Sequence, residues 1–119
     1  MLKIFIVDDE EMVLKSLSRL LSRPDVQIVS FRSSQEALAH LSERPDLLIC
    51  DYHLPLVDGL GVVRETKRHS PSTRTMLLSG AIEDEPVVHA LANKMLDRFV
   101  IKPWLHDEMI ATVDSLLRT

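Results

Sequence analysis

The chain has 119 residues, of which 45% are hydrophobic and 27% charged, and its formal net charge is −4. This length and balance predict one domain over residues 1–119 and exclude a disordered chain. Scattered Lys and Arg argue against direct nucleic-acid binding, and no apolar run approaches the roughly 18 residues that cross a bilayer, which excludes a membrane-spanning protein.

Short β-rich runs alternate with amphipathic stretches from the first residues onward. The run 3–7 ("KIFIV") is β-branched and aromatic and predicts a strand. The stretch 11–22 places leucines at helical spacing and is followed by Pro24, so it predicts a helix. The run 26–31 predicts a second, more polar strand.

The middle of the chain continues the alternation. The stretch 33–44 opens with Ser33-x-x-Glu36, a capping-box pattern, and predicts a helix. The apolar run 46–50 predicts a buried strand, and within it we expect the single cysteine, Cys50, to be a core thiol. The stretch 59–70 predicts a helix despite its two glycines.

The last third repeats the pattern twice. The run 73–79 predicts a strand, and the stretch 85–94 predicts a helix with a proline in its first turn, where a missing N–H costs little. The run 97–101 predicts a fifth strand, and 106–119 a closing amphipathic helix.

Strict alternation of strands and helices predicts the α/β fold class. Apolar strands joined by crossover helices form a parallel sheet, here of five strands, with helices on both faces. Ligands of such sheets bind at the carboxyl ends of the strands. The residues that follow each predicted strand are therefore the candidates for a functional site.

Polar groups follow four of the five predicted strands. They are Asp8 and Asp9, Asp51, Ser79, and Lys102. Taken singly, an Asp or Ser here could be an ordinary helix cap or turn residue, and a lone Lys could be solvated. Because parallel strand ends meet at one edge, the four together predict a shared site.

These side chains suit phosphoryl chemistry. Neighbouring carboxylates repel one another and need a cation, and oxygen ligands suit Mg²⁺. A carboxylate beside Mg²⁺ can attack phosphorus to form an acyl phosphate. A lysine and a hydroxyl can hold the phosphoryl oxygens, and phosphoryl transfer asks a protein mainly for such positioning and charge neutralisation.

Four motifs carry a resemblance to a known family: "VDDE" (7–10), "DYHLPLVDG" (51–59), "LLSG" (77–80) and "FVIKPW" (99–104). In this order and spacing, over essentially the whole chain, they resemble the receiver domains of two-component response regulators. The resemblance implies a flavodoxin-like (βα)5 fold. The last motif is similar to receivers found as N-terminal modules, so we expect a chain that acts alone or is part of a larger regulator.

The resemblance also implies roles for individual residues. Asp51 is the expected phosphoacceptor. Asp9 is the expected direct Mg²⁺ ligand, Asp8 acts mostly through water, and the backbone carbonyl of His53 is the third protein ligand. Lys102 pairs with Asp51 at rest and with phosphate afterwards.

The switch elements are implied in the same way. Ser79 is the expected switch hydroxyl, Phe99 the aromatic that turns inward with it, and the Lys102–Pro103 bond is expected to be cis. Lys94 departs from the family, which usually has glycine there, so Asn93 or Lys94 must adopt a left-handed conformation or the helix must end differently.

His53 and Ala81 stand where family members tune the lifetime of the phosphoryl group. The His53 side chain could orient or obstruct attacking water, or it could be a solvated loop residue, and the sequence leaves this open.

The resulting expectation is a cytoplasmic phosphorelay switch. A histidine kinase or phosphotransfer protein would phosphorylate Asp51, and the domain would catalyse only its own modification and hydrolysis, without being a metabolic enzyme. The face built by residues 85–94, 97–101 and 106–119 would then form a homodimer or bind an output domain.

Two other classes compete with this expectation. One is a receiver-like interaction module that works without phosphorylation. The other is a Mg²⁺-dependent phosphatase, which needs a second acid two residues after the nucleophile, where His53 stands. A nucleotide site would need a glycine-rich loop after the first strand, and "DDEEM" is the opposite.

Overall fold

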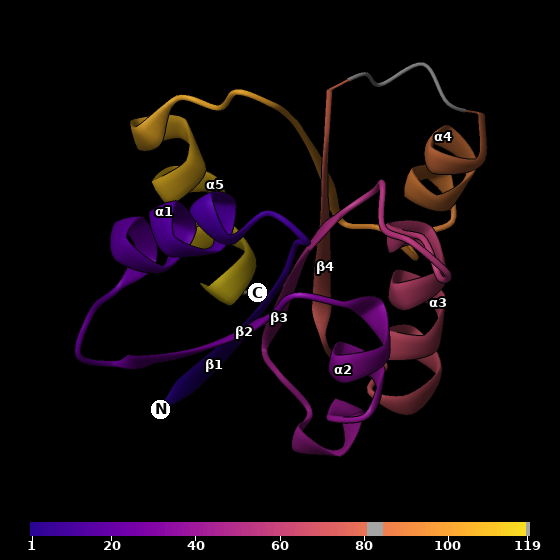
Figure 1. Ribbon diagram of the computed structural model, residues 1–119, viewed down its shortest axis with the longest axis horizontal. Helices are drawn as coiled ribbons and strands as arrows, with labels where there is room; N and C mark the ends of the chain where they lie inside the picture. Colours follow the sequence, from indigo (N-terminus) through magenta and orange to yellow (C-terminus); the bar gives the residue numbers. More distant parts are fainter. Residues whose placement is uncertain (81–84, 119) are drawn as a thin grey trace.

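In the computed structural model, which describes residues 1–80 and 85–118, helices cover both faces of one parallel sheet (Figure 1). Thr119 and the predicted tuning position Ala81 lie outside the described residues. The elements in chain order are β1 (Leu2–Val7), α1 (Glu11–Leu21), β2 (Val26–Phe31), α2 (Ser34–Leu38), the 3-10 helix η1 (Leu41–Glu43), β3 (Leu47–Asp51), α3 (Gly59–His69), β4 (Arg74–Ser79), α4 (Glu85–Ala92), β5 (Arg98–Ile101) and α5 (His106–Arg118).

The strand order is β2-β1-β3-β4-β5, and each neighbouring pair is parallel. Chain order reverses between β1 and β3, which places the topological switch point between these two strands. The predicted flavodoxin-like fold is therefore confirmed, and every predicted strand is present within one or two residues of its expected bounds.

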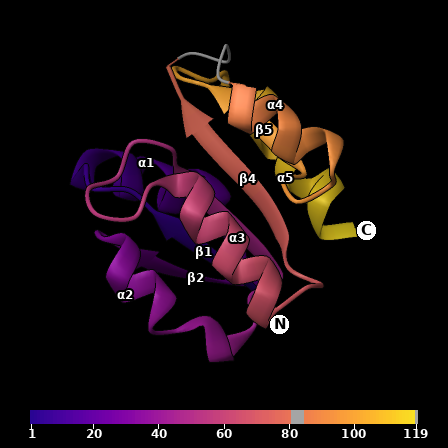
Figure 2. The same cartoon turned by 90° about the vertical axis from the view of Figure 1, so that its right-hand side faces the viewer.

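Alternating side chains of the strands build two cores, one on each face of the sheet. Ile4 and Ile6 of β1 point into a cluster with α1 and α5, whereas Phe5 and Val7 point into a cluster with α2, α3 and α4. The two helix layers lie on opposite sides of the strands in Figure 1, and Figure 2 views the layer of α2, α3 and α4 from its outer side. Cys50 is fully buried in this second cluster, as predicted.

The helix predicted over 33–44 is wrong in its second half. Regular α-helix ends at Leu38 and gives way to η1, a 3-10 turn. The imidazole Nδ1 of His40 lies 2.8 Å from the carbonyl oxygen of Glu36, and the His40 N–H donates to Ala37 instead. Because the side chain occupies the acceptor that an α-helical N–H would use, the chain tightens to i→i−3 bonding.

The Ser33 cap that the capping-box pattern predicts is confirmed at the start of α2. The hydroxyl oxygen of Ser33 accepts the N–H of Glu36 at 3.1 Å, and it lies 3.3 Å from the Glu36 carboxylate. This cap satisfies one of the free N–H groups of the first turn.

Lys94 ends α4 in a left-handed conformation, with φ of 59°. The N–H of Met95 donates to the carbonyl of Ala90, and the N–H of Lys94 donates to that of Leu91. This pair of bonds is the Schellman arrangement, with Lys94 in the position that usually holds glycine. Of the alternatives for this helix end, the structure therefore selects a left-handed Lys94.

Replacing Lys94 by glycine is expected to raise the free energy of unfolding by about 0.5–1 kcal/mol, because glycine adopts positive φ without the clash of a Cβ. Urea unfolding of the variant measures this gain. Lys94→Ala is the matched control, since it also removes the charged side chain but keeps the Cβ. Equal stability of the two variants would contradict the explanation.

Candidate functional site

The carboxyl edge of the sheet brings together the polar residues predicted to form the site. Asp8 and Asp9 follow β1, and Asp51 ends β3, the neighbouring strand. Ser79 ends β4, and Lys102 follows β5. Asp8, Asp51 and Ser79 are buried, with 0%, 6% and 2% of their surface exposed, whereas Asp9 is exposed, so this edge is a polar pocket that solvent reaches on the Asp9 side.

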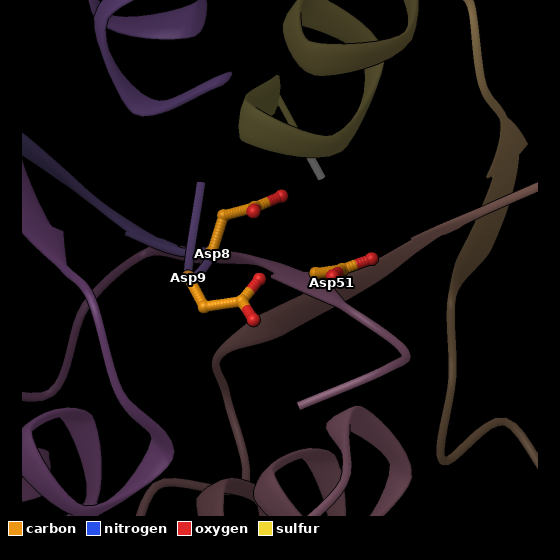
Figure 3. A group of neighbouring side chains, drawn as sticks. All are labelled: Asp8, Asp9 and Asp51. Atoms are coloured by element: carbon orange, nitrogen blue, oxygen red, sulfur yellow. The ribbon is translucent and has the colours of Figure 1, made fainter. Parts of the chain in front are cut away.

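Three carboxylates form the centre of this pocket. One oxygen each from Asp8, Asp9 and Asp51 lies within 4.8 Å of the others, and Figure 3 shows the three side chains gathered where β1 and β3 end. Asp9 is exposed, whereas Asp8 and Asp51 are buried. The arrangement concentrates negative charge and offers oxygen ligands of the kind that hard divalent cations prefer.

Lys102 lies between the two buried carboxylates. Its Nζ is 3.2 Å from Asp8 Oδ2 and 3.2 Å from Asp51 Oδ1. The other oxygen of Asp8 accepts the N–H of Glu10 at 2.8 Å. The sequence predicted the ion pair of Lys102 with Asp51. It did not predict the equally close ion pair with Asp8, because that contact depends on side-chain geometry that a motif does not contain.

Burial and neighbouring charges change the acid–base properties of the pocket. Burial raises the pKa of Asp51 above its ordinary 3.8; the Asp8 carboxylate adds to the rise, and Lys102 opposes it. For Lys102, burial alone would lower the pKa, but the Asp51 and Asp8 carboxylates outweigh it and raise the pKa above 10.5. Burial also raises the pKa of the Cys50 thiol well above 9.0, so this cysteine stays protonated.

Asp51→Asn is expected to stabilise the metal-free protein at neutral pH by about 1 kcal/mol, because it removes a carboxylate whose ionisation burial disfavours. The folded state keeps the Asp51 proton longer than the unfolded state, so native stability falls as pH rises from 3.8 through the raised pKa. The advantage of the variant should be full above this window and absent below pH 3.8. Urea unfolding across the acid range measures it; an advantage independent of pH would contradict this account.

The backbone around Asp51 is fixed by a close approach of helix α3. The N–H of Gly59 donates to the carbonyl of Tyr52 at 2.8 Å, and Asp58 caps the helix by accepting the N–H of Gly61 at 2.8 Å. A Cβ on Gly59 would overlap the carbonyl oxygen of Asp51 and lie 2.8 Å from the Tyr52 Cα. The sequence indicated Gly59 only as the last residue of the motif 51–59 and the first of a helix; its contact with the backbone of Asp51 emerges from the structure.

The remaining predicted residues lie on β4, on β5 or in the loops that follow β3 and β5. The carbonyl of Ser79 accepts the Lys102 N–H at 2.8 Å, which ties β4 to the start of the lysine loop. The Lys102–Pro103 bond is cis, as expected. Phe99 is partly buried against the core under α3 and α4. His53 is exposed, with its ring centroid 5.0 Å from that of Tyr52, so its side chain is not part of the carboxylate cluster.

Comparison with known proteins places this geometry in context. The family model described as the response regulator receiver domain matches residues 4–114. PrrA of Mycobacterium tuberculosis, a transcriptional regulatory protein, is 30% identical over 117 residues, which are 98% of this chain and 50% of that protein. PhoP of Bacillus subtilis, an alkaline phosphatase synthesis transcriptional regulatory protein, is 30% identical over 98% of this chain and 48% of its own length. The chain thus spans about half of these relatives or less.

Two solved structures of receiver domains have the same fold as this chain. The signal receiver domain of an HD domain-containing protein from Pseudomonas fluorescens is 30% identical, with a TM-score of 0.88, over 98% of this chain and 87% of that chain. The DrrB receiver domain activated by BeF3 is 28% identical, with a TM-score of 0.88, over 100% of this chain and 99% of that chain. The shared fold therefore extends over the whole described chain.

Proposed function

The chain belongs to the response regulator receiver domain family of two-component systems, and from this membership we propose that it is a switch controlled by phosphorylation of Asp51. The observation that carries the proposal is the Lys102 ammonium, 3.2 Å from both Asp8 and Asp51 at the carboxyl edge of the sheet. A carboxylate nucleophile, a cation for the phosphoryl oxygens and further acids for a metal are thereby in one pocket.

Magnesium is the cofactor proposed for this pocket, because its donor set consists of carboxylate oxygens within 4.8 Å of one another. Asp9 would hold the ion directly, Asp8 mostly through water, and Asp51 and the backbone carbonyl of His53 would complete the protein ligands. When bound, Mg²⁺ supplies neutralisation of the charge on the carboxylates and the phosphoryl oxygens.

The chain's own residues then carry out the transfer. A carboxylate oxygen of Asp51 bonds to phosphorus while the phosphorus–nitrogen bond of a phosphohistidine breaks, and the imidazole of the donor leaves. Lys102 exchanges its contact with Asp51 for one with a phosphoryl oxygen. Ser79 donates its hydroxyl to another oxygen. The domain thereby catalyses its own modification, and later its hydrolysis by water, but converts no metabolite.

The proposed output surface consists of α4, β5 and α5. In the switch, Ser79 moves toward the phosphoryl group and Phe99 turns inward, which changes this surface. An apolar hollow of about 430 Å³ lies here, lined in part by Ile101, Trp104 and Met109. A homodimer contact or an output domain is the proposed occupant. Contacts of the phosphoryl group with Ser79 and Lys102 would shift the population of two packings, and a partner that binds one packing better would read the shift.

The proposed partners and location go beyond the family membership. A histidine kinase or phosphotransfer protein is the proposed phosphoryl donor. PrrA and PhoP are transcriptional regulatory proteins about twice as long as the matched region, so an output domain is proposed as one of the partners of this chain. Within the described residues, no helix is long and apolar enough to cross a membrane. The cytoplasmic location expected from the composition is part of this proposal, as is the absence of direct DNA binding by this domain.

Phosphorylation by phosphoramidate, a small phosphodonor, tests the proposal. With Mg²⁺ the native chain is expected to gain one phosphoryl group by intact mass, and with EDTA the rate should fall at least tenfold, about 1.4 kcal/mol of barrier. In the presence of Mg²⁺, Asp9→Ala should be phosphorylated only as fast as the native chain is in EDTA. Sedimentation of the phosphorylated sample reports whether it dimerises. A native chain that gains no phosphoryl group would favour the alternative of an unphosphorylated interaction module.

A further inference from the structure

A strained turn lies in the loop that follows Asp51. The N–H of Val57 donates to the carbonyl of Pro55 at 2.9 Å, which closes a three-residue turn around Leu56. Leu56 has φ of 70°. Of the two forms of γ-turn, the one with positive φ is the rarer and more strained, and a leucine with positive φ is uncommon.

The Leu56 side chain is 83% exposed and therefore gains little from packing that could offset this strain. Glycine or asparagine would adopt the same φ at lower cost. The hydrogen bonds that hold the loop also do not use the leucine side chain. Ser34 Oγ donates to the carbonyl of Pro55 at 3.4 Å, and the Gly59 N–H donates to Tyr52. The loop thus holds an apolar side chain outward in a fixed direction.

The position of Leu56 relates it to the proposed phosphorylation site. It stands five residues after Asp51, in the loop between β3 and α3 at the carboxyl edge of the sheet (Figure 1). Two of the three other strands with site residues at this edge, β1 and β5, are also followed by exposed apolar side chains. Met12, three residues after Asp9, is 74% exposed, and Leu105, three residues after Lys102, is 65% exposed. Apolar side chains thus follow each of the strands that supply the carboxylates and the lysine.

This distribution indicates a macromolecular donor. A small phosphodonor needs only the carboxylates and the lysine, and has no use for side chains that project away from them. A protein that inserts a phosphohistidine into the pocket must cover its surroundings, and apolar contacts around a central polar group are typical of protein interfaces with a dominant contact point. A side chain already held in one direction also loses less conformational freedom on binding.

We propose that Leu56 is a docking contact that selects protein phosphodonors over small ones, and that it packs into an apolar depression beside the phosphohistidine of the donor. The inference rests on the proposed phosphorylation of Asp51. Met12 and Leu105 flank the same contact. The strain at residue 56 is retained, on this account, because the side chain contributes to binding the donor rather than to folding.

The test compares two donors on three proteins: the native chain, Leu56→Asn and Leu56→Met. The small donor is phosphoramidate. The protein donor is the autophosphorylated histidine kinase that, in a panel of purified kinases, phosphorylates the native chain fastest. Asparagine relieves the strain but removes the apolar contact, whereas methionine keeps an apolar side chain of similar size.

With Leu56→Asn we expect an unchanged rate from phosphoramidate, a rate from the kinase at least tenfold lower, and a melting temperature about 3 °C higher. Leu56→Met should retain the kinase rate within about threefold. A kinase rate unchanged in Leu56→Asn would overturn the proposal, and so would equal losses with both donors. Loss of self-association by Leu56→Asn with an unchanged kinase rate would assign the contact to a second copy of the chain instead.

The phosphoramidate arm separates this inference from the proposed function. If the native chain accepts no phosphoryl group from phosphoramidate, the proposed function fails. If the native chain and Leu56→Asn accept it equally, the proposed function stands, and the kinase rates alone decide the role of Leu56.

Discussion

Replacing Gly59 by alanine is expected to lower the free energy of unfolding by about 3 kcal/mol, the upper part of the range for overpacked sites. The added Cβ would overlap the carbonyl oxygen of Asp51 and lie 2.8 Å from both the Tyr52 Cα and a Leu77 methyl carbon. Two of these three contacts are with backbone, which cannot move without displacing Asp51. We therefore expect the phosphorylation rate to fall as well, even at temperatures where the variant is folded.

Gly80→Ala is the matched control for this prediction. A Cβ on Gly80 meets no heavy atom of the described residues within 4 Å, so the same substitution just after β4 should change the free energy of unfolding by less than about 0.5 kcal/mol. Urea unfolding and the phosphoramidate reaction are measured on both variants. Similar stability of Gly59→Ala and Gly80→Ala would show that the approach of α3 to Asp51 is not as tight as described.

Lys102→Met is expected to destabilise the metal-free protein by about 2–3 kcal/mol at neutral pH. The substitution leaves the buried carboxylates of Asp8 and Asp51 facing each other without a cation, and breaking a buried ion pair costs more than breaking a surface pair. In the native chain the pKa of Lys102 is raised, so its contribution is full from neutral pH up to pH 10.5 and is lost as pH rises through the raised value. The deficit of the variant should shrink at acid pH, where Asp51 takes up a proton.

Lys3→Met is the control for this second prediction. Lys3 pairs with Glu43 at 2.8 Å and is 24% exposed, close to the 23% of Lys102, but it lies at the opposite end of the sheet. We expect a loss below about 1 kcal/mol, because its partner is a partly solvated carboxylate. Mg²⁺ should restore stability to Lys102→Met and not to Lys3→Met. The double variant Lys102→Met/Asp51→Asn should recover stability without the metal. If it does not, repulsion between the two carboxylates is not the cause.

The fold and the residues that form the site were predictable from the sequence, because both follow from the order of the strands. Each apolar run ends at a polar residue, and parallel topology brings those ends to one edge, so Asp8, Asp9, Asp51 and Lys102 had to converge. The left-handed end of α4 was one of the alternatives that the sequence left open, beside a left-handed Asn93 or a different helix end, and Lys94 adopts it.

Other features depend on geometry that a residue pattern does not contain. The break after α2 arises because the His40 imidazole occupies a backbone carbonyl, which no periodicity reports. The contact of Lys102 with Asp8 depends on side-chain directions within the pocket. The turn at Leu56 runs against local preference, since leucine disfavours positive φ, and such conflicts concentrate at functional sites.

The most direct test of the central claim is the intact mass of the native chain and of Asp51→Asn after incubation with phosphoramidate and Mg²⁺. The account predicts a gain of one phosphoryl group on the native chain and none on the variant, with both proteins folded by circular dichroism. A phosphoryl group gained equally by Asp51→Asn would contradict the assignment of Asp51 as the residue that receives the signal.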